Sequence, residues 1–218
     1  GDDGGGGAGT SVNAMATDQA LYALIAYDRF LQKELPLYRR MDMQNGEYKT
    51  MKVKQVTLTY VHKDGKIQKQ SYAPYEQVAL VDANGWGKNP FAETIYHGQS
   101  AFVMPRESIM LYEQFARSDD GKPVYDGRII HDQTKSWTVT FSDVVANNET
   151  NKKAFTIRDY QGEALTVEIV FEDKKAHIKP LFTYKENQHY TMEVAATVTN
   201  ERGHVILNGA KMPFVYQP

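Results

Sequence analysis

Short segments that alternate apolar and polar residues follow one another through the last third of the chain. They are residues 136–141, 154–159, 164–171, 177–184, 191–199 and 204–209. A period of two residues is typical of a strand with one buried face. Turn-forming residues at 160–163, 172–175 and 200–203 keep the connections short, which favours antiparallel neighbours. The pattern therefore predicts an antiparallel meander.

The middle of the chain continues this pattern. Residues 52–73 predict a hairpin with Val56, Leu58 and Tyr60 on one face and its turn at Asp64-Gly65, a strong two-residue turn signal. Residues 77–82 and 100–105 predict two further short strands. Residues 107–117 could form a helix by composition, but their strand-like neighbours favour a strand.

The beginning of the chain differs from the rest. Residues 1–13 are dominated by glycine and cannot bury enough surface to offset their ordering entropy, so we expect a flexible tether. Residues 17–35 have leucines and an isoleucine at helical spacing, and Pro36 follows. This predicts one amphipathic helix that packs on a sheet, or alternatively binds a partner or a membrane surface.

These elements define the expected fold class. We expect a mainly β protein, all-β to α+β, with residues 14–218 in a single domain. The architecture is an antiparallel β-sandwich, or a curved half-barrel with the one N-terminal helix against its concave face. Fourteen tyrosines and nine phenylalanines suit paired strands, where rings contact one another across a sheet.

Charge and composition exclude several classes of protein. The formal net charge of −2 provides no field that would attract nucleic acid. Cysteine is absent, so the chain has no disulfide, thiolate metal site or cysteine nucleophile. No apolar run approaches the ~20 residues that span a bilayer as a helix.

No motif for catalysis, a metal or a cofactor stands out. The six histidines are at least 12 positions apart, so no local zinc spacing exists. Asp119, Asp120 and Asp126 do not match a calcium loop and are expected in turns. Glu93, Glu107, Glu113 and Asp143 could pair as acids of a hydrolase, but no pattern positions them.

The long loop at residues 84–98 is the candidate binding surface. Trp86 lies between two glycines, and Phe91, Tyr96 and His97 follow it. Loops on a rigid β scaffold often carry binding, and an exposed tryptophan could stack on a sugar or anchor a partner. The alternative is that Trp86 folds back and closes the end of the sandwich.

The first residues resemble the mature part of a bacterial envelope lipoprotein. Asp2 and Asp3 in front of a glycine run are similar to the acidic export signal that follows the lipidated cysteine in Bacteroidetes lipoproteins. The resemblance implies an outer-membrane lipoprotein that faces the periplasm or the cell surface. The membrane would then be reached only through a lipid anchor that precedes this sequence.

Three functions are compatible with these features. The first is a tethered, non-catalytic module that binds a glycan or a protein through the 84–97 loop. The second is a carrier of a hydrophobic ligand or acyl chain, which needs an apolar cavity between helix 17–35 and the sheet. The third is a hydrolase that uses two carboxylates.

Overall fold

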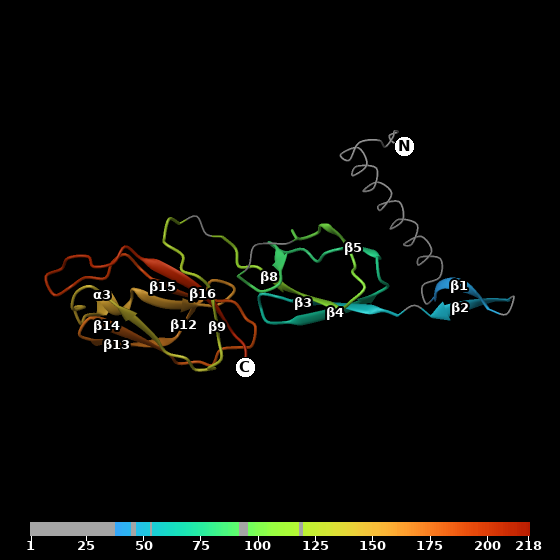
Figure 1. Ribbon diagram of the computed structural model, residues 1–218. Helices are drawn as coiled ribbons and strands as arrows, with labels where there is room; N and C mark the ends of the chain where they lie inside the picture. Colours follow the sequence, from blue (N-terminus) through green and yellow to red (C-terminus); the bar gives the residue numbers. More distant parts are fainter. Residues whose placement is uncertain (1–37, 45–46, 53, 92–95, 118–119) are drawn as a thin grey trace, which may run out of the picture. The chain divides into compact units, whose positions relative to one another are not determined.

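A computed structural model gives the fold, and its described residues are 38–44, 47–52, 54–91, 96–117 and 120–218 (Figure 1). The predicted tether at 1–13 and the predicted helix at 17–35 lie outside these residues, so both stay predictions. The carrier hypothesis also stays a prediction, because its cavity needs that helix as one wall.

Contacts between Cα atoms divide the chain into two compact units that alternate along the sequence. The described residues of unit 1 lie before Tyr60 and in Lys69–Val81 and Gln99–Ile109, and unit 2 consists of Tyr60–Gln68, Asp82–Gly98 and Met110–Pro218. A single domain over residues 14–218 stays a prediction, because its first residues are not described.

Unit 1 contains two antiparallel strand pairs. The pairs are β1 (Tyr38–Gln44) with β2 (Glu47–Lys52), and β5 (Gln77–Ala79) with β7 (Ala101–Val103). Val78 faces Phe102 in the second pair, and both side chains are buried. The strands predicted within residues 77–82 and 100–105 are therefore confirmed.

A four-stranded sheet has the order β4-β3-β8-β6. Its strands are β3 (Val56–Val61), β4 (Ile67–Tyr72), β6 (Trp86–Gly87) and β8 (Ile109–Glu113). The predicted hairpin is confirmed: Gly65 has φ +89° and its N–H donates to the carbonyl of His62 at 2.9 Å. A positive φ costs glycine little, which explains glycine at this turn position. The ambiguous segment 107–117 contains a strand, β8, as expected.

The C-terminal part of the chain forms two sheets (Figure 1). One has the order β10-β14-β13, with β10 (Trp137–Thr140), β14 (Lys175–Pro180) and β13 (Val167–Glu172). The other has the order β12-β11-β15-β16-β9, with β12 (Ala164–Leu165), β11 (Phe155–Arg158), β15 (Tyr190–Val194), β16 (Ala210–Tyr216) and β9 (Arg128–Ile130).

Buried side chains from both sheets share one core, which makes this part a β-sandwich. Trp137 and Ile178 belong to the first sheet, and Ile157 and Phe214 belong to the second. The Trp137 ring lies 4.9 Å from the Phe214 ring, between the sheets. Each fully buried apolar side chain contributes about 1.5–3 kcal/mol. The mainly β fold class is therefore confirmed, in its sandwich form.

Polar groups inside the core are paired. The indole N–H of Trp137 donates to the hydroxyl of Tyr184 at 3.1 Å, and that hydroxyl donates to the carbonyl of Lys135 at 2.9 Å. Burial raises the pKa of Tyr184 to about 12, so the hydroxyl keeps its proton at any physiological pH.

The strand pairing differs from a meander, because β10 pairs with β14 and β11 pairs with β15 rather than each with the next strand. The segment that forms β12 and β13 pairs first with β11 and then with β14, so it changes sheets near Thr166. In addition, β9 pairs with β16 in parallel. The prediction of a purely antiparallel meander is therefore wrong, because local alternation does not encode which strand becomes the partner.

The last strand also differs from the prediction. Residues 204–209 form a loop with a single bridge at Val205, whereas β16 begins at Ala210. Both stretches are apolar, but Gly209 has φ +88° and separates them. The predicted turns at 160–163, 172–175 and 200–203 are confirmed by positive φ angles at Gly162, Asp173 and Gly203.

A one-turn helix between β10 and β11 was not predicted. This helix, α3 (Glu149–Lys152), begins after Asn148, whose side chain accepts a hydrogen bond from the Asn151 N–H at 2.8 Å. The Asn151 side chain is fully buried. Its amide nitrogen donates to the carbonyls of Ala146 and Thr199, and its amide oxygen accepts from the Thr199 N–H. Four residues are too few for a helical period to be visible in the sequence.

Candidate functional site

Trp86 is fully buried, with 0% of its surface exposed. The exposed Trp86 ring that the sequence predicted is therefore not observed, and the ring folds back into the protein. Ligand contact at this residue stays a prediction. Its ring lies 4.8 Å from the ring of Tyr60 and 5.4 Å from that of His62.

The other predicted loop residues do not form one surface with Trp86. The main chains of Trp86 and Tyr96 exchange two hydrogen bonds, of 2.8 and 3.1 Å, so the loop closes on itself. The Tyr96 side chain is half-buried and that of His97 is exposed. Whether they contact a ligand stays a prediction.

Phe91 belongs to a row of stacked rings. Its ring lies 5.4 Å from that of Phe115, which lies 3.8 Å from the imidazole of His189. A Cβ atom on Gly127 would lie 2.0 Å from the Phe91 ring, so only glycine fits at that position. This packing gives Phe91 a structural role within unit 2.

An open hollow of about 540 Å³ lies beside the beginning of the predicted loop. We call it the hairpin hollow, and it is lined by His62, Lys63, Asp64, Asp82, Ala83, Asn84, Glu113 and Tyr160. All eight residues belong to unit 2. They come from the β3–β4 turn, the segment before β6, the end of β8 and the β11–β12 turn. Only Asn84 lies in the predicted loop.

Hydrogen bonds fix one wall of the hairpin hollow. The Glu113 carboxylate accepts a hydrogen bond from the Lys63 N–H at 2.9 Å and lies 3.9 Å from Nδ1 of His62. Nε2 of His62 lies 2.9 Å from the side-chain oxygen of Gln68. Glu113 is buried, with 8% of its surface exposed, and the hydrogen bond from the Lys63 N–H holds its carboxylate in position.

The chemistry of the hairpin hollow suits hydrogen bonding. Carboxylates of Asp64 and Asp82 and the amide of Asn84 offer acceptors, and Tyr160 adds a half-buried aromatic ring. Among the described residues, no three His, Asp or Glu side chains are placed to hold a metal ion. The sequence marked both Asp64 and Tyr160 only as turn residues.

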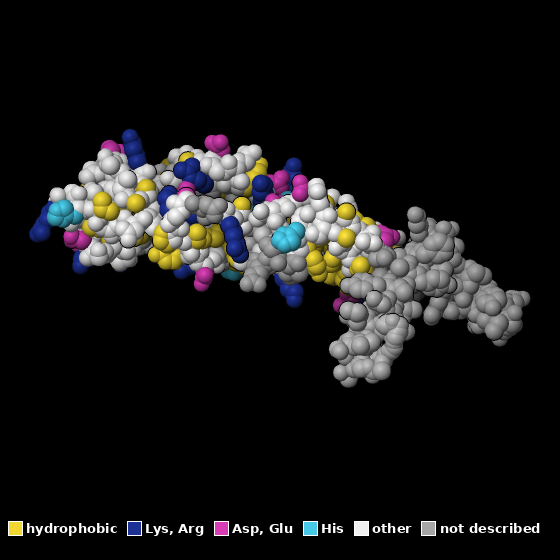
Figure 2. Space-filling view, turned by 90° about the horizontal axis from the view of Figure 1, so that it is seen from above, with side chains coloured by type: hydrophobic (Ala, Val, Ile, Leu, Met, Phe, Trp, Pro, Cys, Tyr) yellow, Lys and Arg dark blue, Asp and Glu magenta, His cyan; other side chains and the backbone are white. Residues whose placement is uncertain are grey.

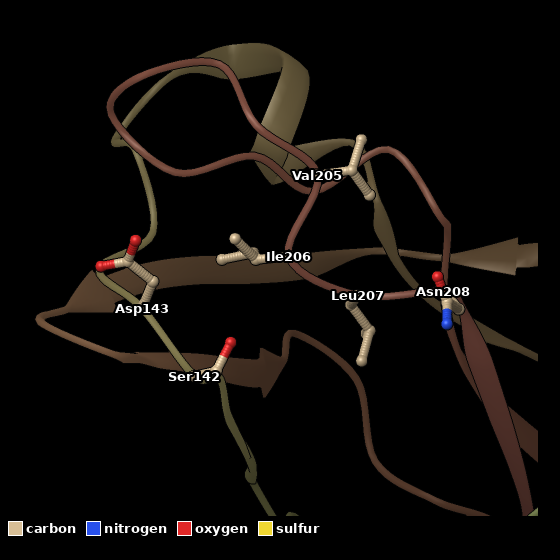
Figure 3. A pocket seen from close by; sticks show the side chains of 6 residues that line it. All are labelled: Ser142, Asp143, Val205, Ile206, Leu207 and Asn208. Carbon is tan, nitrogen blue, oxygen red and sulfur yellow. The ribbon is translucent and has the colours of Figure 1, made fainter.

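A second hollow of about 560 Å³ lies at one end of the sandwich (Figure 3). We call it the loop hollow, and it is lined by Ser142, Asp143, Val205, Ile206, Leu207 and Asn208. Figure 3 shows that these residues come from two segments, one after β10 and one before β16. Apolar side chains of Ile206 and Leu207 lie between more polar groups on either side.

Exposed apolar side chains are scattered. On the face seen in Figure 2 they occur in small groups separated by charged residues. The most exposed examples are Tyr125 at 59%, Val205 at 58% and Val124 at 56%. Scattered apolar groups are normal on a protein surface, so they do not mark a site by themselves.

The strand orders define the class of this part of the chain. A three-stranded sheet β10-β14-β13 faces a second sheet in which β11, β15 and β16 are neighbours, and this is the arrangement of an immunoglobulin-like sandwich. Residues 126–216 match the family model of a bacterial Ig-like domain. Domains of this family are typical of extracellular, non-catalytic parts of bacterial surface proteins. No curated protein matches the chain.

Within the described part of the chain, no helix is both long and apolar enough to cross a membrane.

Proposed function

We propose that this chain is a non-catalytic binding module of the bacterial cell envelope that recognises a glycan through the hairpin hollow. The observation that supports this function most directly is the hairpin hollow, which combines carboxylates, an amide and the Tyr160 ring within one compact unit. The match of residues 126–216 to a family of surface-protein domains supports the location and the absence of catalysis.

Sugars fit the chemistry of the hairpin hollow. Their hydroxyl groups donate hydrogen bonds to carboxylates and amide oxygens, and their apolar ring faces pack on aromatic side chains. Asp82 and Asn84 would accept from hydroxyls, and Tyr160 would support one ring face. A glycan is favoured over a protein because the lining is mostly polar.

A glycan array with purified protein tests this function. Asn84→Ala and Tyr160→Ala should each weaken binding by about tenfold, which corresponds to about 1.4 kcal/mol. Asn208→Ala removes an equivalent exposed amide from the loop hollow and is the matched control, so it should bind normally. Unchanged binding in both hairpin-hollow variants, or no glycan bound by the parent protein, contradicts the proposal.

Trp86→Ala is not a test of ligand contact. Because the Trp86 ring is fully buried, its removal leaves a cavity and should lower stability by about 3–5 kcal/mol. Any loss of binding in that variant would follow from unfolding.

We further propose that the chain is held at the outer membrane by a lipid on a preceding cysteine. The acidic, glycine-rich residues at 1–13 support this attachment. Metabolic labelling with palmitate in the native cells tests it, and an unlabelled protein would contradict it.

A further inference from the structure

The same dipeptide, Asn-Gly, lies in both hollows. It occurs in the sequence at Asn45, Asn84 and Asn208, and the first of these lies outside the described residues. Asn84 lines the hairpin hollow, and Asn208 lines the loop hollow. Because glycine has no side chain, nothing on it shields its main-chain nitrogen from the side chain of the preceding asparagine. In both dipeptides that nitrogen can therefore attack the side-chain carbonyl carbon of the asparagine.

The two asparagines are equivalent in exposure and in side-chain bonding. Both are exposed, and in the part of the chain that the structure describes neither side-chain amide makes a hydrogen bond. The reaction also needs the main chain to rotate, because the glycine nitrogen must come into line with the side-chain carbon. Any difference in reactivity between Asn84 and Asn208 must therefore come from the main chain around them.

The main chain that follows Asn84 is fixed by hydrogen bonds. The carbonyl of Gly85 accepts from the Gln114 N–H at 3.0 Å. The main chain of Trp86 exchanges two hydrogen bonds with that of Tyr96, and the Trp86 ring is fully buried. Rotation at Asn84 would break these contacts.

The main chain around Asn208 is not held in this way. Among the described residues, 207–209 take part in no main-chain hydrogen bond. The nearest pairing is the bond from the Ile206 N–H to the Val198 carbonyl, at 3.0 Å, on one side and strand β16, from Ala210, on the other. Figure 3 shows Asn208 on the segment that leads into this strand. The dipeptide can therefore rotate without the loss of a main-chain hydrogen bond.

The packing of the two segments differs in the same direction. A Cβ atom on Gly98 would lie 2.2 Å from the carbonyl oxygen of Ala83, which directly precedes Asn84. The nearest atom to a Cβ on Gly209 would be the carbonyl oxygen of Val194, at 3.3 Å. The segment that contains Asn84 is therefore the more tightly packed of the two.

We propose that Asn208 is a site of spontaneous modification, at which the amide becomes a carboxyl group, and that the fold protects Asn84 from the same reaction. The nitrogen of Gly209 bonds to Cγ of Asn208, and the bond from Cγ to Nδ2 breaks. Ammonia leaves with the proton of the Gly209 N–H, and a cyclic imide remains. Water then opens this ring at either carbonyl, which gives an aspartyl or an isoaspartyl residue at position 208.

The modification changes the loop hollow and leaves the hairpin hollow intact. It adds a carboxylate to a lining that already contains Asp143. The isoaspartyl product also lengthens the main chain one residue before β16, which pairs with both β15 and β9. The amide of Asn84, in the hollow that we propose binds a glycan, is preserved. The reaction at Asn208 does not depend on that proposed binding.

Mass spectrometry of the full chain, stored folded at neutral pH and then digested, tests the proposal. Trypsin releases residues 70–88 and 203–211, which contain Asn84 and Asn208 as their only asparagines. The peptide with Asn208 should gain the mass of the amide-to-acid conversion at least about tenfold faster than the peptide with Asn84, because only Asn84 needs a local opening first. Equal rates, or a faster reaction at Asn84, overturn the proposal.

Storage of the same chain in concentrated urea is the control for the fold. The two peptides should then convert at similar rates, because both asparagines precede glycine and no packing remains. If the difference between them persists in urea, local sequence rather than the fold sets it, and the protection of Asn84 is overturned.

The products and one variant test the chemical route. Both aspartyl and isoaspartyl forms of peptide 203–211 should appear, because water opens the cyclic imide on either side. An aspartyl product alone would mean direct hydrolysis and overturns the route through Gly209. Asn208→Gln keeps an amide but would have to close a larger ring, so the rapid mass gain should disappear. A mass gain that stays as fast in this variant also overturns the proposal.

Discussion

At the scale of single residues, His189 has the most unusual environment. It is 6% exposed, its ring stacks on Phe115, and its main-chain N–H donates to the carbonyl of Lys63 at 2.9 Å. Burial lowers the pKa of His189 from 6.5 to about 4. A hydrogen bond with the main chain of Glu113 opposes this shift, and the charge of Lys63 adds to it. The imidazole is therefore neutral in the folded protein at neutral pH.

This environment predicts a loss of stability in acid. Above pH 6.5 the imidazole is neutral in both states, and its full contribution to stability is present. Between pH 6.5 and about 4 the unfolded chain binds a proton that the folded chain does not, so stability falls by up to about 3 kcal/mol. Urea unfolding of the parent chain and of His189→Phe at several pH values measures this loss.

The phenylalanine variant should lose less stability than the parent over this pH range. His97→Phe changes an exposed histidine and is the control, so its pH dependence should match that of the parent. Parallel pH dependences in the parent and His189→Phe would show that another group is responsible.

At the scale of secondary structure elements, two glycine turns differ in their surroundings. Gly65 in the β3–β4 turn and Gly203 in the β15–β16 connection both have positive φ, of +89° and +80°. A Cβ atom at Gly65 would lie 2.6 Å from the carbonyl oxygen of Glu186, whereas one at Gly203 would contact nothing within 4 Å.

Gly65→Ala should therefore destabilise the protein more than Gly203→Ala. Both variants have the cost of an unfavourable φ, about 1 kcal/mol, but only the first adds a main-chain clash. We expect about 2–3 kcal/mol for Gly65→Ala and about 1 kcal/mol for Gly203→Ala in chemical denaturation. Equal losses would mean that the turn moves away from Glu186 at little cost.

The elements also show what local sequence encodes. The turn at Asp64-Gly65 and the strands at 137–140 and 155–158 follow from turn residues and alternation alone. Residues 204–209 and 210–216 are both apolar, and only the second forms a strand because it pairs with β15 and β9. The burial of Trp86 likewise depends on Tyr60 and His62, which are distant in sequence.

At the scale of the whole molecule, unit 2 extends beyond the residues that match the Ig-like family. It includes Tyr60–Gln68 and Asp82–Gly98 as well as Met110–Pro218. The turn after β3 reaches the sandwich through the bridge between Asp64 and Gln188, and Phe115 covers His189. These contacts should make the turn and the sandwich unfold together.

Hydrogen exchange of the intact chain can measure this cooperativity. The N–H of His189, bonded to Lys63, should exchange with nearly the same free energy as that of Met192 in β15. Phe115→Ala removes the ring stacked on the imidazole and should lower the protection of His189 and Met192 by nearly the same free energy, because both N–H groups exchange when the unit unfolds. Exchange of His189 at the rate of an exposed loop in the parent chain would contradict a single cooperative unit.

The sequence by itself determined the mainly β class, the positions of most turns and most strands of the sandwich. These features depend on the alternation of nearby residues and on the φ angles that glycine tolerates. Only the tertiary structure decided the parallel pairing of β9 with β16, the change of sheet near Thr166 and the burial of Trp86. It also brought Tyr160 beside the β3–β4 turn to form the hairpin hollow. Such contacts join residues far apart in the chain, and local patterning has no means of specifying them.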